Sequence, residues 1–158
     1  ASCVDFYVYD MNVYLAEYGR SLFFHGGKVA NVLSATNIQG LQAAMPADGH
    51  IAILISHTGE NERLVEIAKM LRKNKTKVIV ITSKTEGTLA PYADELLYAA
   101  GQKKVEEFWS SMFFASGKYL LDILYGMEFS RRYDENLKLN KKYEQSGEKL
   151  LWGLIEDV

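Results

Sequence analysis

The sequence predicts an α/β protein, a three-layer α-β-α sandwich built on a five-stranded parallel sheet. Two short apolar runs rich in β-branched residues, 51–55 and 77–81, are typical of strands that are buried on both faces. Longer segments with apolar residues at helical spacing separate the strand-like runs. Strands that alternate with helices form parallel sheets through right-handed crossovers, and the commonest five-strand order is 2-1-3-4-5.

The first half of the chain predicts two strand–helix pairs, over residues 4–9, 13–24, 28–33 and 37–45. Asp10-Met11-Asn12 offers an N-cap for the first helix. That helix ends at His25-Gly26-Gly27, where a glycine suits a left-handed C-cap. Pro46 ends the second helix, because proline lacks the N–H that would continue it.

The second half predicts three more strands and two helices, over residues 51–55, 61–73, 77–81, 89–93 and 95–99. In the longer of these helices the apolar residues recur at helical spacing and face the sheet; they are Leu64, Ile67, Ala68 and Leu71. Pro91 is tolerated in the shorter helix only within its first turn.

The remainder of the chain predicts further helix. Residues 105–129 are apolar on more than one face, so one side rests on the sheet and another needs a second helix or another subunit. The tail over 131–158 is polar and then carries an apolar docking segment at 150–155. We expect one domain over 1–158, with a sheet core at about 4–100 and a C-terminal helical segment at about 104–158.

Composition excludes several classes of protein. The chain is 48% hydrophobic and 24% charged, which is ordinary for a globular domain, and its net charge of -2 is unlike that of a nucleic-acid-binding chain. No apolar run approaches the roughly 20 residues of a membrane span, so we expect a cytoplasmic protein with no membrane partner. Cys3 is the single cysteine, and His25 and His50 lack metal-ligand spacing, so we expect no disulfide, metal or cofactor.

The stretch from the third predicted strand into the next helix is the strongest functional signal. Six residues follow the strand and lead into the helix: Ser56, His57, Thr58, Gly59, Glu60 and Asn61. The glycine permits a tight turn, and the first N–H groups of a helix are unpaired and carry partial positive charge. Hydroxyl groups add further donors, so this loop predicts a phosphate-binding site. Helix capping by the same hydroxyls is the competing interpretation.

Two other loops are expected near this one, because ligands in such sheets bind beyond the carboxyl ends of the strands where the strand order reverses. The loop after the first strand carries Asp10 and Asn12, and the turn over 82–88 carries Thr82 and Ser83. We expect all four side chains at the edge of the site, with Thr82 and Ser83 either contacting ligand or forming the turn.

The loop resembles a known family. Ile55-Ser56-His57-Thr58-Gly59-Glu60-Asn61 resembles the Ser-x-Ser-Gly-x-Thr phosphosugar loop of SIS (sugar isomerase) domains, which have a flavodoxin-like fold. The strand 78–82, which ends in threonine, and the segment 89–94 resemble the elements that follow it. Leu121-Asp122-Ile123-Leu124 is similar to a segment of the effector domains of RpiR-type transcriptional regulators. The resemblance covers about 4–126.

The resemblance implies a phosphosugar-binding sensor with no catalytic activity, the effector domain of a regulator of sugar metabolism. It implies a homodimer or higher homo-oligomer, and DNA binding through an N-terminal helix-turn-helix domain that is missing here. Ser56, Thr58 and Asn61 stand where the phosphate-binding hydroxyls of the family stand, with Asn61 in place of threonine or serine. The first loop departs from the family, since Asp10 and Asn12 replace its glycines and serine; Asp10 would repel phosphate but accept bonds from sugar hydroxyls.

Two other functions remain open at this point. A sugar-phosphate aldose–ketose isomerase would need a base and a carbonyl-polarising group, for which His57, Glu60, Glu106 and Glu107 are the candidates. Glu107, with Glu106, would reach over the site from the long helix. A receiver-like domain would need an aspartate where Ser56 stands. We favour the sensor.

Overall fold

The computed structural model describes residues 1–101 and 109–156, and their side chains over 1–101 and 110–148. The elements are β1 (Cys3–Tyr7), α1 (Asn12–His25), β2 (Val29–Leu33), α2 (Thr36–Ala44), β3 (His50–Ile55), α3 (Glu62–Lys73), β4 (Lys77–Thr82), η1 (Ala90–Tyr92), β5 (Glu95–Tyr98), α4 (Trp109–Arg131) and α5 (Tyr133–Glu156).

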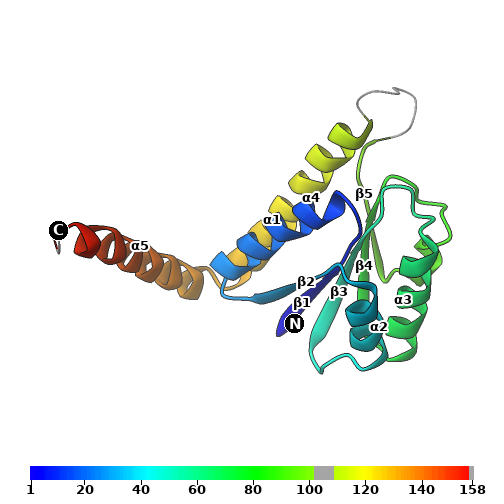
Figure 1. Ribbon diagram of the computed structural model, residues 1–158, viewed down its shortest axis with the longest axis horizontal. Helices are drawn as coiled ribbons and strands as arrows, with labels where there is room; N and C mark the ends of the chain where they lie inside the picture. The colour runs from blue at the N-terminus through cyan, green and yellow to red at the C-terminus, as the bar shows by residue number, and fades with distance from the viewer. Residues whose placement is uncertain (102–108, 157–158) are drawn as a thin grey trace.

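The five strands form one parallel sheet in the order β2-β1-β3-β4-β5, which confirms the predicted topology. Helices α1 and α4 cover one face, and α2 and α3 cover the other (Figure 1). β1 pairs with β2 on one side and β3 on the other, so the chain reverses direction across the sheet at this strand. The loops after β1 and β3 therefore emerge side by side at the carboxyl edge.

The core lies on both faces of the sheet, because successive side chains of a strand point to opposite sides. In β1, Val4 and Phe6 pack toward α1 and α4, whereas Tyr7 packs toward α2 and α3. Gln39 of α2 is fully buried, and its side-chain amide donates to the carbonyls of Val8 (3.1 Å) and Leu33 (2.6 Å). That pair of bonds fixes α2 over the carboxyl ends of β1 and β2.

Several predicted boundaries shift. β1 ends at Tyr7, two residues earlier than predicted, and no side chain caps α1, whose N-cap is Met11. α4 begins at Trp109 within the described residues and runs to Arg131; residues 105–108 of the predicted helix lie outside them. Pro91 falls in the first turn of η1, as predicted.

The tail forms the helix α5 and extends away from the body of the domain (Figure 1). Its first half is fixed to the ends of α4 and α1: Asn136 donates to the Phe129 carbonyl (3.2 Å) and Asn140 to the His25 carbonyl (3.1 Å). The side chains of the predicted docking segment, 150–155, lie outside the described ones. None of the described helices is both long enough and apolar enough to span a membrane.

Two glycines set how closely α1 and α4 approach. A Cβ placed on Gly19 of α1 would lie 2.7 Å from Cζ of Phe6 and 3.3 Å from Cδ1 of Leu121. A Cβ on Gly117 of α4 would lie 2.6 Å from Cδ2 of Leu15. Each helix thus places a leucine against the glycine of the other. Both leucines are fully buried.

Gly19→Ala is therefore expected to destabilise the domain. Overpacking a filled core costs about 1–3 kcal/mol, which exceeds the roughly 0.5–1 kcal/mol that alanine gains over glycine in a helix. The Phe6 ring is fully buried in the core, so it can move aside only by displacing the side chains packed around it. Chemical denaturation of the variant should report a lower free energy of unfolding.

Gly126→Ala on α4 is the matched control, because a Cβ there meets nothing within 4 Å. It should stabilise the domain by about 0.5–1 kcal/mol. Equal stabilisation by both substitutions would contradict the packing described for Gly19.

Candidate functional site

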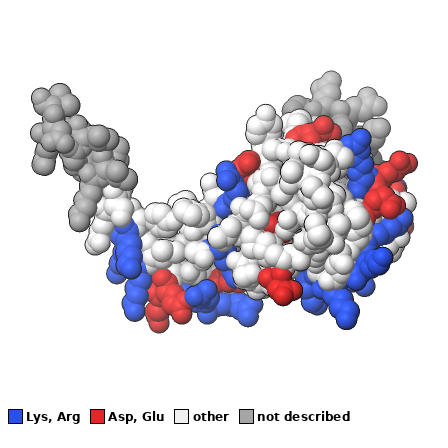
Figure 2. Space-filling view, turned by 60° about the horizontal axis from the view of Figure 1, so that its bottom comes forward, with Lys and Arg blue, Asp and Glu red and all other residues white. Residues whose placement is uncertain are grey.

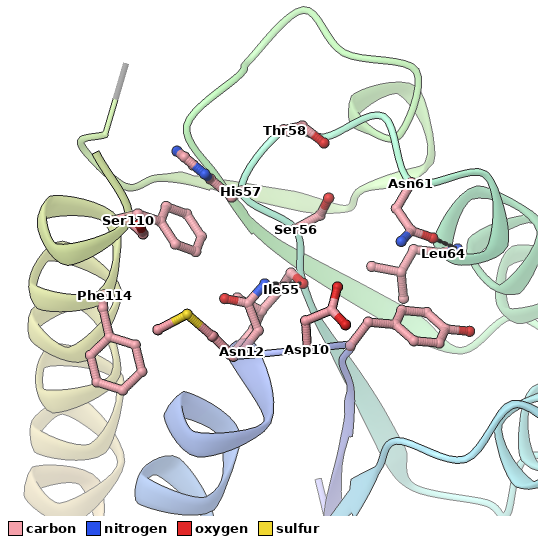
Figure 3. A pocket seen from close by; sticks show the side chains of 13 residues that line it. Asp10, Asn12, Ile55, Ser56, His57, Thr58, Asn61, Leu64, Ser110 and Phe114 are labelled. Atoms are coloured by element: carbon pink, nitrogen blue, oxygen red, sulfur yellow. Dashed lines mark hydrogen bonds between the residues drawn. The ribbon is translucent and has the colours of Figure 1, made fainter. Parts of the chain in front are cut away.

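A cavity of about 330 Å³ opens at the carboxyl edge of the sheet, where the loops after β1 and β3 diverge. The loop after β3 supplies Ser56, His57, Thr58 and Asn61, and the start of α1 supplies Asn12. Figure 3 shows these side chains around one hollow, with α4 forming the wall opposite α3. Asp10, from the loop before α1, lines the cavity as well, so the structure brings together six of the predicted site residues.

The two hydroxyl groups of this loop accept hydrogen bonds from backbone N–H groups of the same loop. Their own O–H groups can still donate to a ligand. Ser56 Oγ accepts from the Gly59 N–H (3.1 Å), and Thr58 Oγ1 accepts from the Glu60 N–H (3.3 Å). A hydroxyl that accepts a hydrogen bond still has its O–H to donate. Ser56 is buried, whereas Thr58 is exposed. Both groups can act as donors to an anion.

Asn61, and not a hydroxyl of Ser56 or Thr58, caps the helix that follows the loop. Its Oδ1 accepts from the Leu64 N–H (3.0 Å), so it is the N-cap of α3. The side chain lies at the cavity wall, with Oδ1 directed to the helix (Figure 3). Capping uses the oxygen and leaves the amide NH₂, which is a donor, for a ligand.

Thr82 and Ser83 lie beneath the loop and do not line the cavity. Both hydroxyls donate to the His57 carbonyl, at 3.3 Å for Thr82 and 2.9 Å for Ser83, and the Ser83 N–H does so too (3.2 Å). Both side chains are buried. Of the two roles considered for them, the observed contacts are those of turn formation.

His57, from the loop after β3, packs against the wall of the cavity that α4 forms. Its ring lies on that of Phe113, with centroids 4.6 Å apart and an interplanar angle of 34°. Its Nε2 lies 2.7 Å from the Gly101 carbonyl, so Nε2 carries the proton and donates it. These two contacts fix the ring at the mouth of the cavity.

Glu60 points away from the cavity, into a small network with the turn after β4. Its carboxylate accepts from Lys84 Nζ (2.5 Å) and from Thr88 Oγ1 (2.7 Å). The hydrogen bond from Lys84, and then those from Thr88, lower the pKa of Glu60 from 4.5 to about 2. Such a carboxylate is a weak base, and its position does not suit proton abstraction from a bound sugar.

The first loop supplies a carboxylate in place of the glycine of the family. Asp10 has φ +51°, in the left-handed region that aspartate tolerates better than most residues. Its side chain is exposed and points from the loop before α1 toward Ser56 (Figure 3). Asn12 Nδ2 donates to the Ile55 carbonyl (3.4 Å), which links this loop to the end of β3.

Sequence reasoning missed the part of the cavity built by α4. Ser110, Phe113 and Phe114 line it, whereas the sequence predicts contacts of the apolar faces of this helix only with the sheet and with a second helix or subunit. Which side of a helix with several apolar faces meets the cavity cannot be read from periodicity. Glu107 and Glu106 lie outside the described residues.

Gly59→Ala is expected to distort the loop. Gly59 has φ +64°, and a Cβ there would lie 3.0 Å from Thr82 Oγ1 and 3.3 Å from the Lys84 carbonyl. The left-handed conformation alone costs roughly 1–2 kcal/mol with a side chain. Thermal denaturation should show this loss, while Gly40→Ala, a helical position with nothing within 4 Å, should gain about 0.5–1 kcal/mol.

Lys84→Met should raise the pKa of Glu60 from about 2 toward its ordinary value of 4.5, because the largest stabiliser of the carboxylate is lost. A lowered pKa in the folded state stabilises the fold above the unfolded value, and this is lost as pH falls through the folded value. In the variant this contribution should therefore be smaller, and its loss, which starts near the unfolded pKa in both proteins, should be complete at a higher pH. Carboxyl-carbon NMR titration measures the shift directly.

Lys69→Met serves as the control for this titration, since Lys69 pairs with Glu66 (2.6 Å) on the same helix. It should leave the pKa of Glu60 unchanged. If Glu60 titrated alike in all three proteins, its bond to Lys84 would be refuted.

Comparison with known proteins places this geometry in a family. The sequence profile of the SIS domain matches residues 13–117. The HTH-type transcriptional regulator HexR of Escherichia coli K12 is 41% identical over 46 residues, which are 29% of this chain and 16% of that regulator. The chain thus aligns with only a small part of this curated relative.

Solved structures show the same fold. The Vibrio vulnificus NanR protein complexed with ManNAc-6P superposes with a TM-score of 0.80 and 18% identity, over 95% of this chain and 56% of that one. The sugar isomerase domain of an RpiR transcription factor from Sphaerobacter thermophilus has a TM-score of 0.77 and 14% identity, over 92% of this chain and 79% of that one. Because the family profile spans most of the chain and the sheet has the predicted strand order, the chain belongs to the SIS domain family.

Proposed function

We propose that this domain is the phosphosugar-sensing effector domain of a transcriptional regulator of the RpiR type, without catalytic activity of its own. The observation that carries the proposal is the loop Ser56–Asn61, which lies between β3 and the N-terminus of α3 and lines a cavity of sugar size. A phosphate there would meet the first turn of α3, the hydroxyl protons of Ser56 and Thr58 and the amide of Asn61.

The rest of the cavity suits the sugar. Apolar walls from α4 and Leu64 can pack on the ring carbons, and Asp10 can accept bonds from sugar hydroxyls. Since Asp10 repels a nearby anion, we place the phosphate on the α3 side and the hydroxyls on the side of α1.

Within the part of the chain that the structure describes, the contacts of the candidate bases favour a sensor over an isomerase. Among the described residues near the loop, Glu60 is held away from the cavity by Lys84 and Thr88. His57 lies at the cavity mouth, where its Nε2 is bonded to the Gly101 carbonyl and its ring packs on Phe113. Asp10, the carboxylate at the cavity itself, is exposed.

We assign DNA binding to another part of the regulator, an N-terminal helix-turn-helix domain, in keeping with the name of the HTH-type relative. The regulator would act in the cytoplasm. The net charge here is -2, and positive and negative side chains are interspersed on the face shown in Figure 2. We also propose a homodimer. The helix α5 projects from the body of the domain and offers a surface to which a second copy could bind (Figure 1).

Isothermal titration tests the proposal with hexose and amino-sugar phosphates, among them ManNAc-6P, and their unphosphorylated sugars. At least one phosphate ester should bind, and its parent sugar should not. Ser56→Ala should weaken binding by about 10- to 100-fold, because a hydrogen bond to a charged group contributes about 1.5–3 kcal/mol.

Ser34→Ala is the control, since Ser34 is an exposed serine just past β2 that does not line the cavity. It should bind like the wild type. Absence of heat with every ester would refute the sensor, and so would unchanged affinity in Ser56→Ala. Turnover of an ester in a coupled assay would replace the sensor with an isomerase.

A further inference from the structure

A second cluster of polar side chains lies at the opposite, amino edge of the sheet. Cys3 begins β1, His50 begins β3, and the two residues are paired across the strands. Asp5 lies two residues beyond Cys3 and so projects from the same face. The sulfur, carboxylate oxygen and imidazole nitrogen of this trio all lie within 4.8 Å of one another.

The trio is closely packed. His50 Nδ1 is 2.7 Å from Asp5 Oδ2, and Cys3 Sγ is 3.8 Å from Asp5 Oδ1. Cys3 and Asp5 are buried, and the His50 side chain is 17% exposed, which leaves a route from solvent. Donor atoms around a tetrahedral zinc ion, bound at 2.0–2.3 Å, lie roughly 3.3–3.8 Å apart. Small side-chain movements therefore suffice to reach that spacing.

We propose that Cys3, Asp5 and His50 bind one zinc ion. The three donor types, thiolate, carboxylate and imidazole, are those found in protein zinc sites. Zinc would replace the thiol proton of Cys3, which goes to solvent. The ring proton of neutral His50 would lie on Nε2 when Nδ1 binds the ion, so the imidazole stays neutral. The ion's two positive charges balance the thiolate and the carboxylate, so a buried site carries no net charge.

The fourth position and the support of the ligands come from neighbouring amides. The Asn31 side-chain amide lies 2.7 Å from Asp5 Oδ1 and 3.4 Å from Cys3 Sγ. Turned about its last bond, it presents its oxygen to the ion; otherwise water takes that place. Gln42 Nε2 donates to Asp5 Oδ2 (3.2 Å) and orients the carboxylate from outside. The ion would fasten β1 to β3 at the edge remote from the cavity.

Cobalt substitution tests the site in the whole chain after treatment with a chelator. Co²⁺ should bind with a stoichiometry of one, with a thiolate-to-metal charge-transfer band and the intense visible bands of tetrahedral cobalt, and Zn²⁺ should displace it. Cys3→Ser should abolish the charge-transfer band. His50→Gln should weaken zinc binding by more than the roughly 10- to 100-fold that loss of an outer partner costs.

His25→Gln is the control, because His25 is exposed at the end of α1, where its ring contacts the Ser21 carbonyl. It should bind metal as the wild type does, and zinc should raise the melting temperature of both proteins but not that of His50→Gln. The proposal fails if the wild type takes up no cobalt or zinc, or if Cys3→Ser and His50→Gln bind them unchanged. Sugar-phosphate titration is independent of this outcome, since the two sites lie at opposite edges of the sheet.

Discussion

The pairing of β1 between β2 and β3 is the constraint on which the other features depend. Because the strands are parallel and in register, their carboxyl ends meet at one edge and their amino ends at the other. The reversal of direction at β1 separates the loops that leave β1 and β3, and the cavity lies between them. The same pairing brings Cys3 beside His50 at the far edge. One strand register thus determines both clusters of polar side chains.

The loop after β3 is held in shape before any ligand arrives. Gly59 supplies the left-handed turn, and the carbonyl of His57 receives bonds from two buried hydroxyls and a backbone N–H of the strand next to it. Glu60 ties the outer side of the loop to Lys84 and Thr88. Because the loop is ordered by the protein itself, little conformational entropy remains to be lost on binding. Such preorganisation suits a sensor that must respond to modest ligand concentrations.

The fold and the loop that lines the cavity could be predicted from the sequence, and the other walls of the cavity could not. The strands and the loop Ser56–Asn61 followed from local patterns: apolar runs, a glycine and clustered hydroxyls. The strand order followed from the preference of five-stranded parallel sheets for one arrangement. Phe113 and Ser110 were missed because the rotation of α4 about its axis depends on tertiary packing, including the contact of Gly117 with Leu15. Thr82 and Ser83 follow a strand end as predicted, but the direction of their side chains depends on the neighbouring loop. His50 was judged against its sequence neighbours, whereas its partners come from β1, 45 residues away for Asp5.

The interlocked contact of α1 with α4 has a mechanical consequence. Where each helix seats a leucine in the space left by the other's glycine, sliding of one past the other requires both to unpack. The two helices must then tilt as one rigid body. α4 spans about 35 Å at 1.5 Å per residue, with the cavity wall at one end and α5 attached at the other. A slight rotation imposed at Phe113 would be magnified along this lever, and the tip of α5 would sweep through the largest arc.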